Sequence, residues 1–191
     1  MSVGVIVATY GDKTVWEPLA RNAIKSVDRQ TIEPYDVSWV HGKTLHEARN
    51  FGAENMPTDQ LIFLDADDEL DERYIECMLA AEGDIRRPNT IGMIDGVLQG
   101  VPEMIPRRNL KEGNFIVIGA MCYREQFLRV GGFEDYPILE DWVLWQKLQR
   151  DGATIVDVPD AIYKINIRPG SRNTHKTQHN KIYQEIRRRF K

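Results

Sequence analysis

The chain has 191 residues, of which 42% are hydrophobic and 28% charged, and its formal net charge is −4. These values are ordinary for a globular domain and exclude a disordered or collagen-like chain. No stretch approaches the roughly 18 apolar residues that span a bilayer. The first residues lack a basic segment, which predicts a buried strand rather than a signal peptide. Cys77 and Cys122 form no metal-binding pattern, which predicts reduced thiols in a cytoplasmic protein.

The first half of the chain alternates short apolar runs with helical patterns. Helix Thr44–Asn55 opens on a capping box, because Glu47 follows Thr44 by three residues. Such alternation predicts a parallel sheet covered by helices, with ligands at the carboxyl ends of the strands. The predicted strands are Val3–Ala8, Tyr35–Val40 and Leu61–Leu64, and the other predicted helices are Val15–Val27 and Leu70–Ala81.

The second half mixes glycine-rich strands with two further helices. Gly131 and Gly132 predict a tight turn, since glycine tolerates positive φ. Apolar and turn residues predict a hairpin over Ile91–Met104, strands over Phe115–Cys122, Ala153–Val158 and Ala161–Ile165, a helix over Leu139–Arg150 and a basic amphipathic helix over Thr177–Lys191.

Charge is unevenly distributed along the chain. Residues 164–191 contain nine Lys or Arg residues and one acid, Glu185, so this segment carries a formal charge of +8. The rest of the chain therefore carries −12. A basic segment on an acidic body predicts either a solvated terminal helix or a surface for an anion, such as a diphosphate, DNA or an anionic membrane.

An acidic loop follows the third predicted strand. Asp65, Asp67 and Asp68 come directly after Leu61–Leu64, and such close carboxylates repel one another unless a cation or donors neutralise them. Oxygen ligands suit Mg²⁺ or Mn²⁺, which would keep positions open for phosphate oxygens. Capping of the next helix is the alternative, but it accounts for only one or two of the acids. Phosphatases that form an aspartyl-phosphate also carry Asp-x-Asp after a strand, usually the first.

Five segments carry short motifs in a fixed order: Val3–Tyr10, Ala48–Gly52, Ile62–Glu69, Gly131–Glu134 and Glu140–Trp145. In this order they resemble the first strand, the Ala-Arg-Asn-x-Gly helix, the Asp-x-Asp strand end, the Gly-Gly-Phe turn and the Glu-Asp motif of family 2 glycosyltransferases. The resemblance covers roughly residues 3–168. It implies an α/β fold, a single GT-A domain with a Rossmann-like, mixed but mostly parallel sheet and helices on both faces.

The resemblance also implies a site. The family transfers a sugar from a nucleotide-sugar to an acceptor hydroxyl, usually with a divalent metal, here Mn²⁺ or Mg²⁺. Asp141, beside Glu140, would be the general base of an inverting reaction. Asp67 and Asp65, with His175 as a further candidate, would hold the metal. The other implied residues are Thr9, Tyr10, Asp12, Arg49, Asp65, Ala66, Asp67, Arg168 and Arg172 for the nucleotide-sugar, and Gly119, Ala120 and Trp142 for the acceptor side.

Within this single domain, residues 1–90 are expected to bind the nucleotide, residues 91–168 to face the acceptor and residues 169–191 to form a basic loop and helix. A UDP-sugar is the first expectation for the donor. The second strand lacks the family's acidic loop, so Asp12 or His41 is expected to replace its contact with the nucleobase. Trp145 is expected in the core, whereas Trp142 could stack on a sugar or join the core.

Other functions stay open at this point. One is a degenerate nucleotide-sugar binding module, and another is a phosphatase or nucleotidyltransferase that uses the Asp65 and Asp67 loop. The acceptor could be a glycan, a lipid, a protein side chain or a modified DNA base. The basic C-terminal segment keeps DNA and a membrane surface as partners, with a cytoplasmic location that is peripheral at the membrane in the second case.

Overall fold

Eight strands join one sheet in the computed structural model, which describes residues 1–168 and 176–191. The strands are β1 (Val3–Tyr10), β2 (Asp36–Gly42), β3 (Gln60–Asp65), β4 (Glu69–Leu70), β5 (Ile85–Ile94), β6 (Val97–Glu103), β7 (Met121–Tyr123) and β8 (Ile155–Asn166). The helices are α1 (Lys13–Asp28), α2 (Leu45–Asn55), α3 (Tyr74–Ala80), α4 (Arg124–Arg129), α5 (Glu140–Arg150) and α6 (Lys176–Arg189).

The sheet is mixed but mostly parallel, as predicted. Its order is β2-β1-β3-β7-β5-β8-β4, and β6 pairs with β5 beside this path. β1 is parallel to both β2 and β3, and β5 is parallel to β8. β7 lies between β3 and β5 and is antiparallel to both, so β1, β2, β3, β5 and β8 share one direction. Their carboxyl ends therefore meet at one edge.

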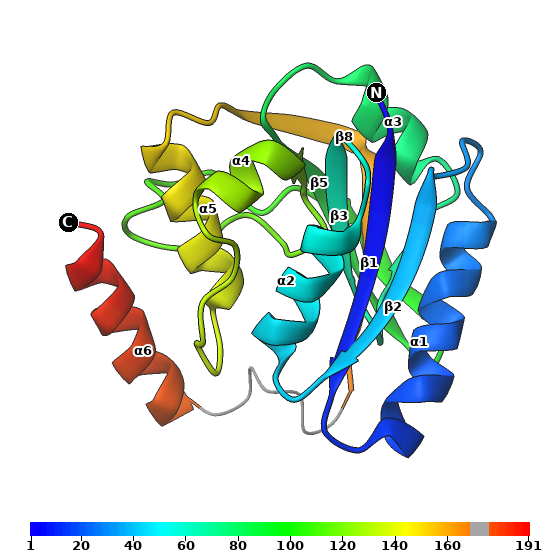
Figure 1. Ribbon diagram of the computed structural model, residues 1–191, viewed down its shortest axis with the longest axis horizontal. Helices are drawn as coiled ribbons and strands as arrows, with labels where there is room; N and C mark the ends of the chain where they lie inside the picture. The colour runs from blue at the N-terminus through cyan, green and yellow to red at the C-terminus, as the bar shows by residue number, and fades with distance from the viewer. Residues whose placement is uncertain (169–175) are drawn as a thin grey trace.

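Helices cover both faces of this sheet. Figure 1 shows α2, α4 and α5 on the left of the sheet and α1 on its right. Thr44 caps α2 by accepting a hydrogen bond from the Glu47 backbone N–H at 3.3 Å, which confirms half of the predicted capping box. A Cβ on Gly52 would lie 2.6 Å from Ile6, so only glycine lets α2 pack this closely on β1.

An apolar core lies between the sheet and the helices on either side. Phe63, Phe127 and Phe133 form an aromatic cluster with ring centroids 4.8–5.5 Å apart. Trp142 and Trp145 are fully buried on α5, and the Trp145 indole N–H donates to the Ile116 carbonyl. No helix in the described part of the chain is long and apolar enough to cross a membrane.

Four predicted elements differ from the observed ones. The helix predicted from Leu70 begins at Tyr74, because Leu70 pairs with Tyr163 of β8 in the short strand β4. Only the end of the predicted strand Phe115–Cys122 is a strand, since the Phe115 carbonyl instead accepts a hydrogen bond from buried Arg87. The two late strands are one strand, β8, with a register shift at its pairing with β5. The short helix α4 was not predicted.

Candidate functional site

The carboxyl ends of β1, β2 and β3 bring polar residues to one edge of the sheet. Their register sets Thr9 opposite His41 and Ala8 opposite Asp65. Thr9 is buried, and its hydroxyl lies 2.9 Å from His41 Nδ1 and accepts a hydrogen bond from Trp39 Nε1 at 3.0 Å. Thr9 therefore fixes two rings at this edge.

The other residues predicted for the nucleotide-sugar lie nearby or serve the fold. Tyr10 is partly exposed at the end of β1, and Ala66 is buried in the turn after β3. Asp12 accepts hydrogen bonds from the backbone N–H and hydroxyl of Thr14, so it is the N-cap of α1. Contact of these residues with a nucleotide stays a prediction.

The acidic loop lies beyond β3 and does not cap the next helix. Asp67 Oδ2 accepts two hydrogen bonds from Arg168, at 2.5 and 3.1 Å. Asp68 is buried and accepts a hydrogen bond from the Asn166 backbone N–H at 2.8 Å. Burial, and then the charges of Asp65 and Asp67, raise the pKa of Asp68 well above its ordinary value. The structure thus gathers three carboxylates where β3 and β8 end.

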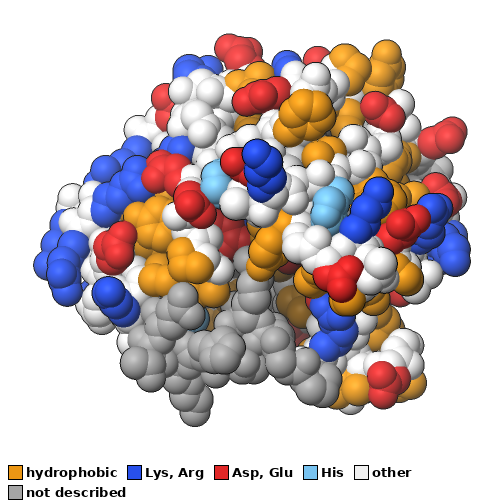
Figure 2. Space-filling view, turned by 60° about the horizontal axis from the view of Figure 1, so that its bottom comes forward, with side chains coloured by type: hydrophobic (Ala, Val, Ile, Leu, Met, Phe, Trp, Pro, Cys, Tyr) orange, Lys and Arg blue, Asp and Glu red, His pale blue; other side chains and the backbone are white. Residues whose placement is uncertain are grey.

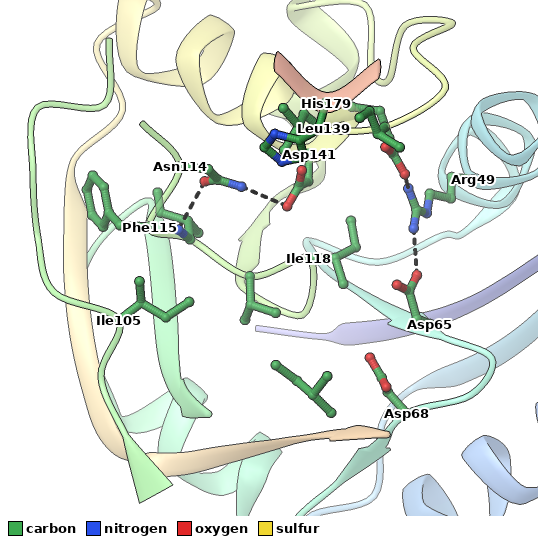
Figure 3. Close-up of a pocket in the computed structure, with 15 residues that line it drawn as sticks. Arg49, Asp65, Asp68, Ile105, Asn114, Phe115, Ile118, Leu139, Asp141 and His179 are labelled. Carbon is green, nitrogen blue, oxygen red and sulfur yellow. Dashed lines mark hydrogen bonds and ion pairs between the residues drawn. The ribbon is translucent and has the colours of Figure 1, made fainter. Parts of the chain in front are cut away.

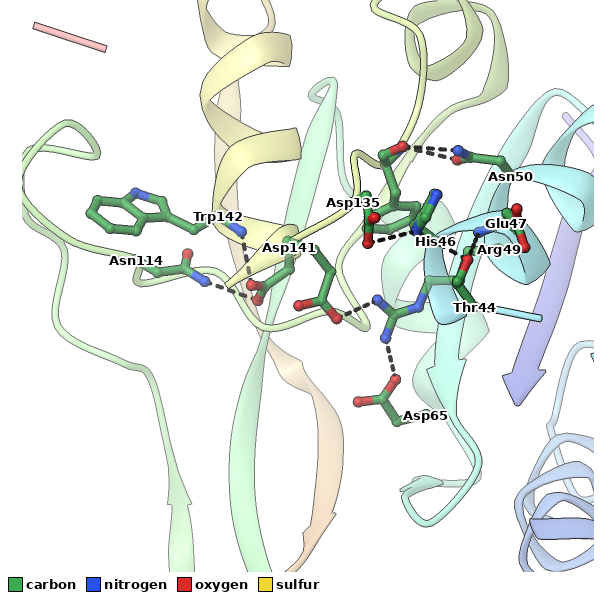
Figure 4. A network of polar contacts seen from close by, with 12 residues as sticks. Thr44, His46, Glu47, Arg49, Asn50, Asp65, Asn114, Asp135, Asp141 and Trp142 are labelled. Atoms are coloured by element: carbon green, nitrogen blue, oxygen red, sulfur yellow. Dashed lines mark hydrogen bonds and ion pairs between the residues drawn. The ribbon is translucent and has the colours of Figure 1, made fainter. Parts of the chain in front are cut away.

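A buried arginine joins the acidic loop to the predicted base motif (Figure 4). Arg49 is 2% exposed, and it donates to Asp65 Oδ1 at 2.6 Å and to Glu140 Oε1 at 2.8 Å. Its guanidinium also lies 5.0 Å from the centroid of the Phe133 ring. Burial lowers the pKa of Arg49, but the two carboxylates outweigh it and raise that pKa above its ordinary value. Arg49 therefore stays charged.

The next residue on α2 holds the glycine turn. Asn50 Oδ1 accepts a hydrogen bond from the Phe133 backbone N–H at 2.8 Å, and Asn50 Nδ2 donates to the Phe133 carbonyl at 2.9 Å. Gly131 and Gly132 have φ of 77° and 60°, which confirms the turn predicted for them. Arg49 and Asn50 thus link two motifs that are distant in sequence, and we call these two residues the α2 clamp.

Asp141 begins α5 beside Glu140. Asp141 Oδ2 accepts a hydrogen bond from Asn114 Nδ2 at 2.9 Å, and Asp141 Oδ1 accepts one from the Trp142 backbone N–H at 2.8 Å. Burial, and then the charge of Glu140, raise the pKa of Asp141 to about 7. A carboxylate with such a pKa suits proton transfer near neutral pH.

Asp141 and two residues of the acidic loop, Asp65 and Asp68, line one cavity of about 400 Å³, whereas Asp67 does not line it (Figure 3). Asp141 enters it from α5, and Asp65 enters it from the end of β3. Polar side chains on several elements and apolar side chains of the 105–118 segment share its lining. The polar lining residues are Arg49, Asp65, Asp68, Asn114, Glu140, Asp141 and His179.

The residues predicted for the acceptor side are buried. Gly119 and Ala120 lie in a turn rather than on a strand, and a Cβ on Gly119 would be 2.2 Å from the Tyr163 ring. Trp142 is 0% exposed and donates to the Leu110 carbonyl at 2.6 Å, so it cannot stack on a sugar. Trp142 therefore belongs to the core, which is one of the two roles that the sequence left open for it, and not to a surface that stacks on a sugar. Contact of Gly119 and Ala120 with an acceptor stays a prediction.

We expect the Trp142→Phe substitution to destabilise the fold by about 1–3 kcal/mol, because the buried Leu110 carbonyl loses its donor. The acceptor KM should stay within about twofold, since Trp142 reaches no solvent. Urea unfolding and initial-rate kinetics would measure both, with Tyr35→Phe, at a 67% exposed residue, as the control. A higher KM at unchanged stability would contradict the burial of Trp142.

Asn114 and His179 were not predicted as parts of the site, and Asp68 was predicted only as a member of the acidic loop. Asp68 belongs to the acidic run, whereas Asn114 and His179 stand in no local motif and reach the cavity only through the fold. The predicted Arg172 and His175 lie outside the described residues. Among the described residues, no group of three or more His, Cys, Asp or Glu side chains is arranged to hold a metal ion.

A model of one protein family matches the chain. It is described as glycosyl transferase family 2, and it covers residues 37–133, just over half of the chain. This stretch includes the α2 clamp, the acidic loop and the glycine turn. No curated protein matches the chain in sequence.

Solved structures share the fold at low sequence identity. S. aureus TarS residues 1–349 in complex with UDP-GlcNAc superposes with a TM-score of 0.69 and 16% identity over 92% of this chain. S. aureus TarS gives a TM-score of 0.67 and 15% identity over 97% of this chain. The present chain spans 61% of the first of these structures and 39% of the second.

Proposed function

Because the chain belongs to glycosyl transferase family 2, we propose that it transfers a sugar from a nucleoside-diphosphate sugar to an acceptor hydroxyl. One observation carries this proposal: two carboxylates of the acidic loop, Asp65 and Asp68, line the same cavity as Asp141. A similar fold binds UDP-GlcNAc in TarS, which favours a UDP-sugar as the donor. The cavity then offers a place for the donor diphosphate on one side and for a nucleophile on the other.

We propose that Asp65 and Asp67 of the acidic loop hold a divalent cation, Mn²⁺ or Mg²⁺, together with phosphate oxygens of the donor. Among the described residues, Arg49 engages one oxygen of Asp65 and Arg168 engages one oxygen of Asp67, which leaves a second oxygen on each. These cations are commonly held by one or two carboxylates and by phosphate oxygens. A bound cation would act as a Lewis acid toward the diphosphate. We include His175 in this site only as a prediction from the sequence.

Asp141 is proposed as the general base. Its carboxylate accepts the proton of the acceptor hydroxyl while the acceptor oxygen bonds to the anomeric carbon. The bond from that carbon to the diphosphate oxygen breaks, and its electron pair leaves with the diphosphate. Attack opposite the leaving group inverts the anomeric centre. Asn114 positions Asp141 through the 2.9 Å hydrogen bond.

Arg168 is proposed to stabilise the leaving diphosphate. Its guanidinium lies at the acidic loop, next to the carboxylate of Asp67, and arginine binds phosphate oxygens through paired N–H donors. Arg172 is the further candidate from the sequence. The charge that develops on the diphosphate thus meets a cation of the protein in a partly enclosed site.

We expect one nucleoside diphosphate, with Mn²⁺, to raise the melting temperature, and EDTA or Asp67→Ala to remove this rise. At 100 times its Kd, a ligand stabilises the fold by about 2.7 kcal/mol. For a chain of this size such a gain corresponds to about 5–10 °C. Thermal shift with UDP, GDP, CDP, ADP and dTDP, and with their sugars, would measure it.

The control variant is Asp160→Ala, which removes an exposed carboxylate from β8. This control should keep the full shift with the same nucleotide. If no nucleotide shifts a cooperatively melting protein, the transferase proposal fails. If a nucleotide-sugar binds but is neither transferred nor hydrolysed, the chain is a binding module instead.

A further inference from the structure

A second cavity, of about 490 Å³, lies between the 106–112 segment and helix α6. Three guanidinium groups and one carboxylate line it, so its net charge is positive. We call it the basic pocket, and its lining residues are Pro106, Arg107, Arg108, Glu112, Tyr183 and Arg187. None of these residues has a role in the site described above.

Neighbouring acids do not neutralise the basic pocket. Asp157 is the partner of Arg107, at 2.7 Å, but it is shared with Arg87 at 2.5 Å, so one carboxylate serves two guanidiniums. Within the described residues, Arg108 and Arg187 have no ion pair with an acid. Arginine side chains that form no ion pair with an acid are well suited to bind phosphate oxygens.

One face of α6 connects the basic pocket to the catalytic cavity. His179, Tyr183 and Arg187 are spaced four residues apart, so their side chains follow one another along the helix. The His179 ring stacks on Tyr183 at 6.4 Å, and the Arg187 guanidinium lies 5.8 Å from the centre of the same ring. His179 lines the cavity of Asp141, whereas Arg187 lines the basic pocket.

The connecting residue is held in place. The Tyr183 hydroxyl donates to the Glu112 carbonyl, and its ring lies 5.1 Å from that of buried Trp142. α6 is therefore fixed across the 110–114 segment, with one cavity on each side of this contact. The rise of 1.5 Å per helical residue puts His179 and Arg187 about 12 Å apart along the axis. A molecule that occupies both cavities needs roughly this length.

The shape of the site favours a discrete phosphate over a membrane or a DNA duplex. Figure 2 shows Lys and Arg side chains gathered at the left edge, where α6 and the C-terminus lie in Figure 1. A flat contact would use this whole edge, including exposed Arg188. Arg107, Arg108 and Arg187, which come from two separate segments, instead line one shallow pocket.

We propose that the acceptor carries a phosphate group that binds in the basic pocket while its hydroxyl reaches Asp141. This inference rests on the proposed transferase function and names the chemical class of its acceptor. Arg108 and Arg187 would then determine acceptor specificity without touching the reacting atoms.

The binding experiment uses a fluorescent inorganic polyphosphate of about eight units, with the donor site filled by the nucleotide found in the thermal-shift screen. We expect the double variant Arg108→Gln/Arg187→Gln to weaken binding at least tenfold. The matched control is Arg188→Gln, which removes the same charge one residue along α6 and should change Kd less than twofold. Equal losses for Arg187→Gln and Arg188→Gln would indicate a diffuse surface and overturn the proposal.

The activity experiment compares disaccharides that carry a phosphate on the far ring with the same disaccharides without it. Transfer to the phosphorylated set should be at least tenfold faster at low concentration, and the double variant should remove this preference. Donor hydrolysis by water should stay unchanged in that variant. Equal transfer to both sets, with donor hydrolysis intact, overturns the inference and leaves the transferase function standing. Preferred binding of anionic vesicles or duplex DNA over polyphosphate would also overturn it.

Discussion

Asp141→Asn is expected to lower the rate of sugar transfer by about 10²–10⁴-fold, because the acceptor hydroxyl loses its proton acceptor. In the unchanged protein, kcat/KM should rise with pH through about 7 and then level off, since the pKa of Asp141 is raised to about 7 and only its charged form is a base. Release of nucleoside diphosphate over pH 5–9 would measure both effects.

The same variant should be more stable than the unchanged protein at pH 8. The folded-state pKa of Asp141 lies above its ordinary value of 3.8, so the folded protein binds more protons between pH 4 and 7 and loses stability as the pH rises through that window. Three pKa units correspond to about 4 kcal/mol, which is an upper bound on the gain at pH 8. At pH 4 the two proteins should be nearly equal.

Asp135→Asn is the control for this pair of effects, because the Asp135 side chain is 79% exposed in the loop before α5. It should change stability by less than about 0.5 kcal/mol at either pH. A variant Asp141→Asn that keeps its transfer rate, or that loses stability at pH 8, would contradict the assignment of Asp141 as a partly buried, functional carboxylate.

Arg49→Met is expected to destabilise the fold by about 3–5 kcal/mol. The substitution removes the 2.8 Å ion pair between Arg49 and buried Glu140, and it frees Asp65 from its 2.6 Å partner. Removing one member of a buried ion pair is costly because the remaining charge stays buried without the attraction of that member. Urea unfolding at pH 7 would measure the loss. Arg49 also lowers the pKa of Asp141, so the rise of activity should move to higher pH in this variant.

Two comparisons separate the buried pairing from a general effect of charge removal. Arg21→Met breaks an exposed pair with Glu17 on α1 and should cost less than about 1 kcal/mol. Adding Glu140→Gln to Arg49→Met should recover part of the lost stability, since the buried carboxylate that Arg49 stabilised is then replaced by a neutral group. If the double variant is no more stable than Arg49→Met, Glu140 is not the partner that matters.

Local sequence signals predicted much of the fold correctly. The sequence predicts four elements close to where the structure has them: β1, α2, β3 and α5. Each is indicated by residues within its own segment, either a run of buried apolar residues, a capping box or helical spacing. The start of α3 was missed because Leu70 pairs with Tyr163, which lies 93 positions later. Such a partner competes with local helix propensity and leaves no trace near Leu70.

The site residues likewise fall into two groups: those that local sequence motifs predict and those that only tertiary packing brings to the cavity. The acidic loop and the Glu140–Asp141 pair could be read from neighbouring residues and from the order of motifs. Asn114 and His179 reach the cavity through tertiary packing alone. For Trp142 the sequence left two roles open, a sugar contact or a place in the core, and tertiary packing places its ring in the core.

The α2 clamp also limits how this molecule can move. One helix holds the carboxylate at the end of β3, the acid that starts α5 and the turn before it, while a continuous sheet runs beneath all three. The two sides of the cleft therefore cannot swing apart as rigid bodies about a hinge. Substrates must then enter, and products leave, through a cavity whose two sides keep their relative positions. Turnover therefore depends on movements of side chains and loops at the opening of the cavity.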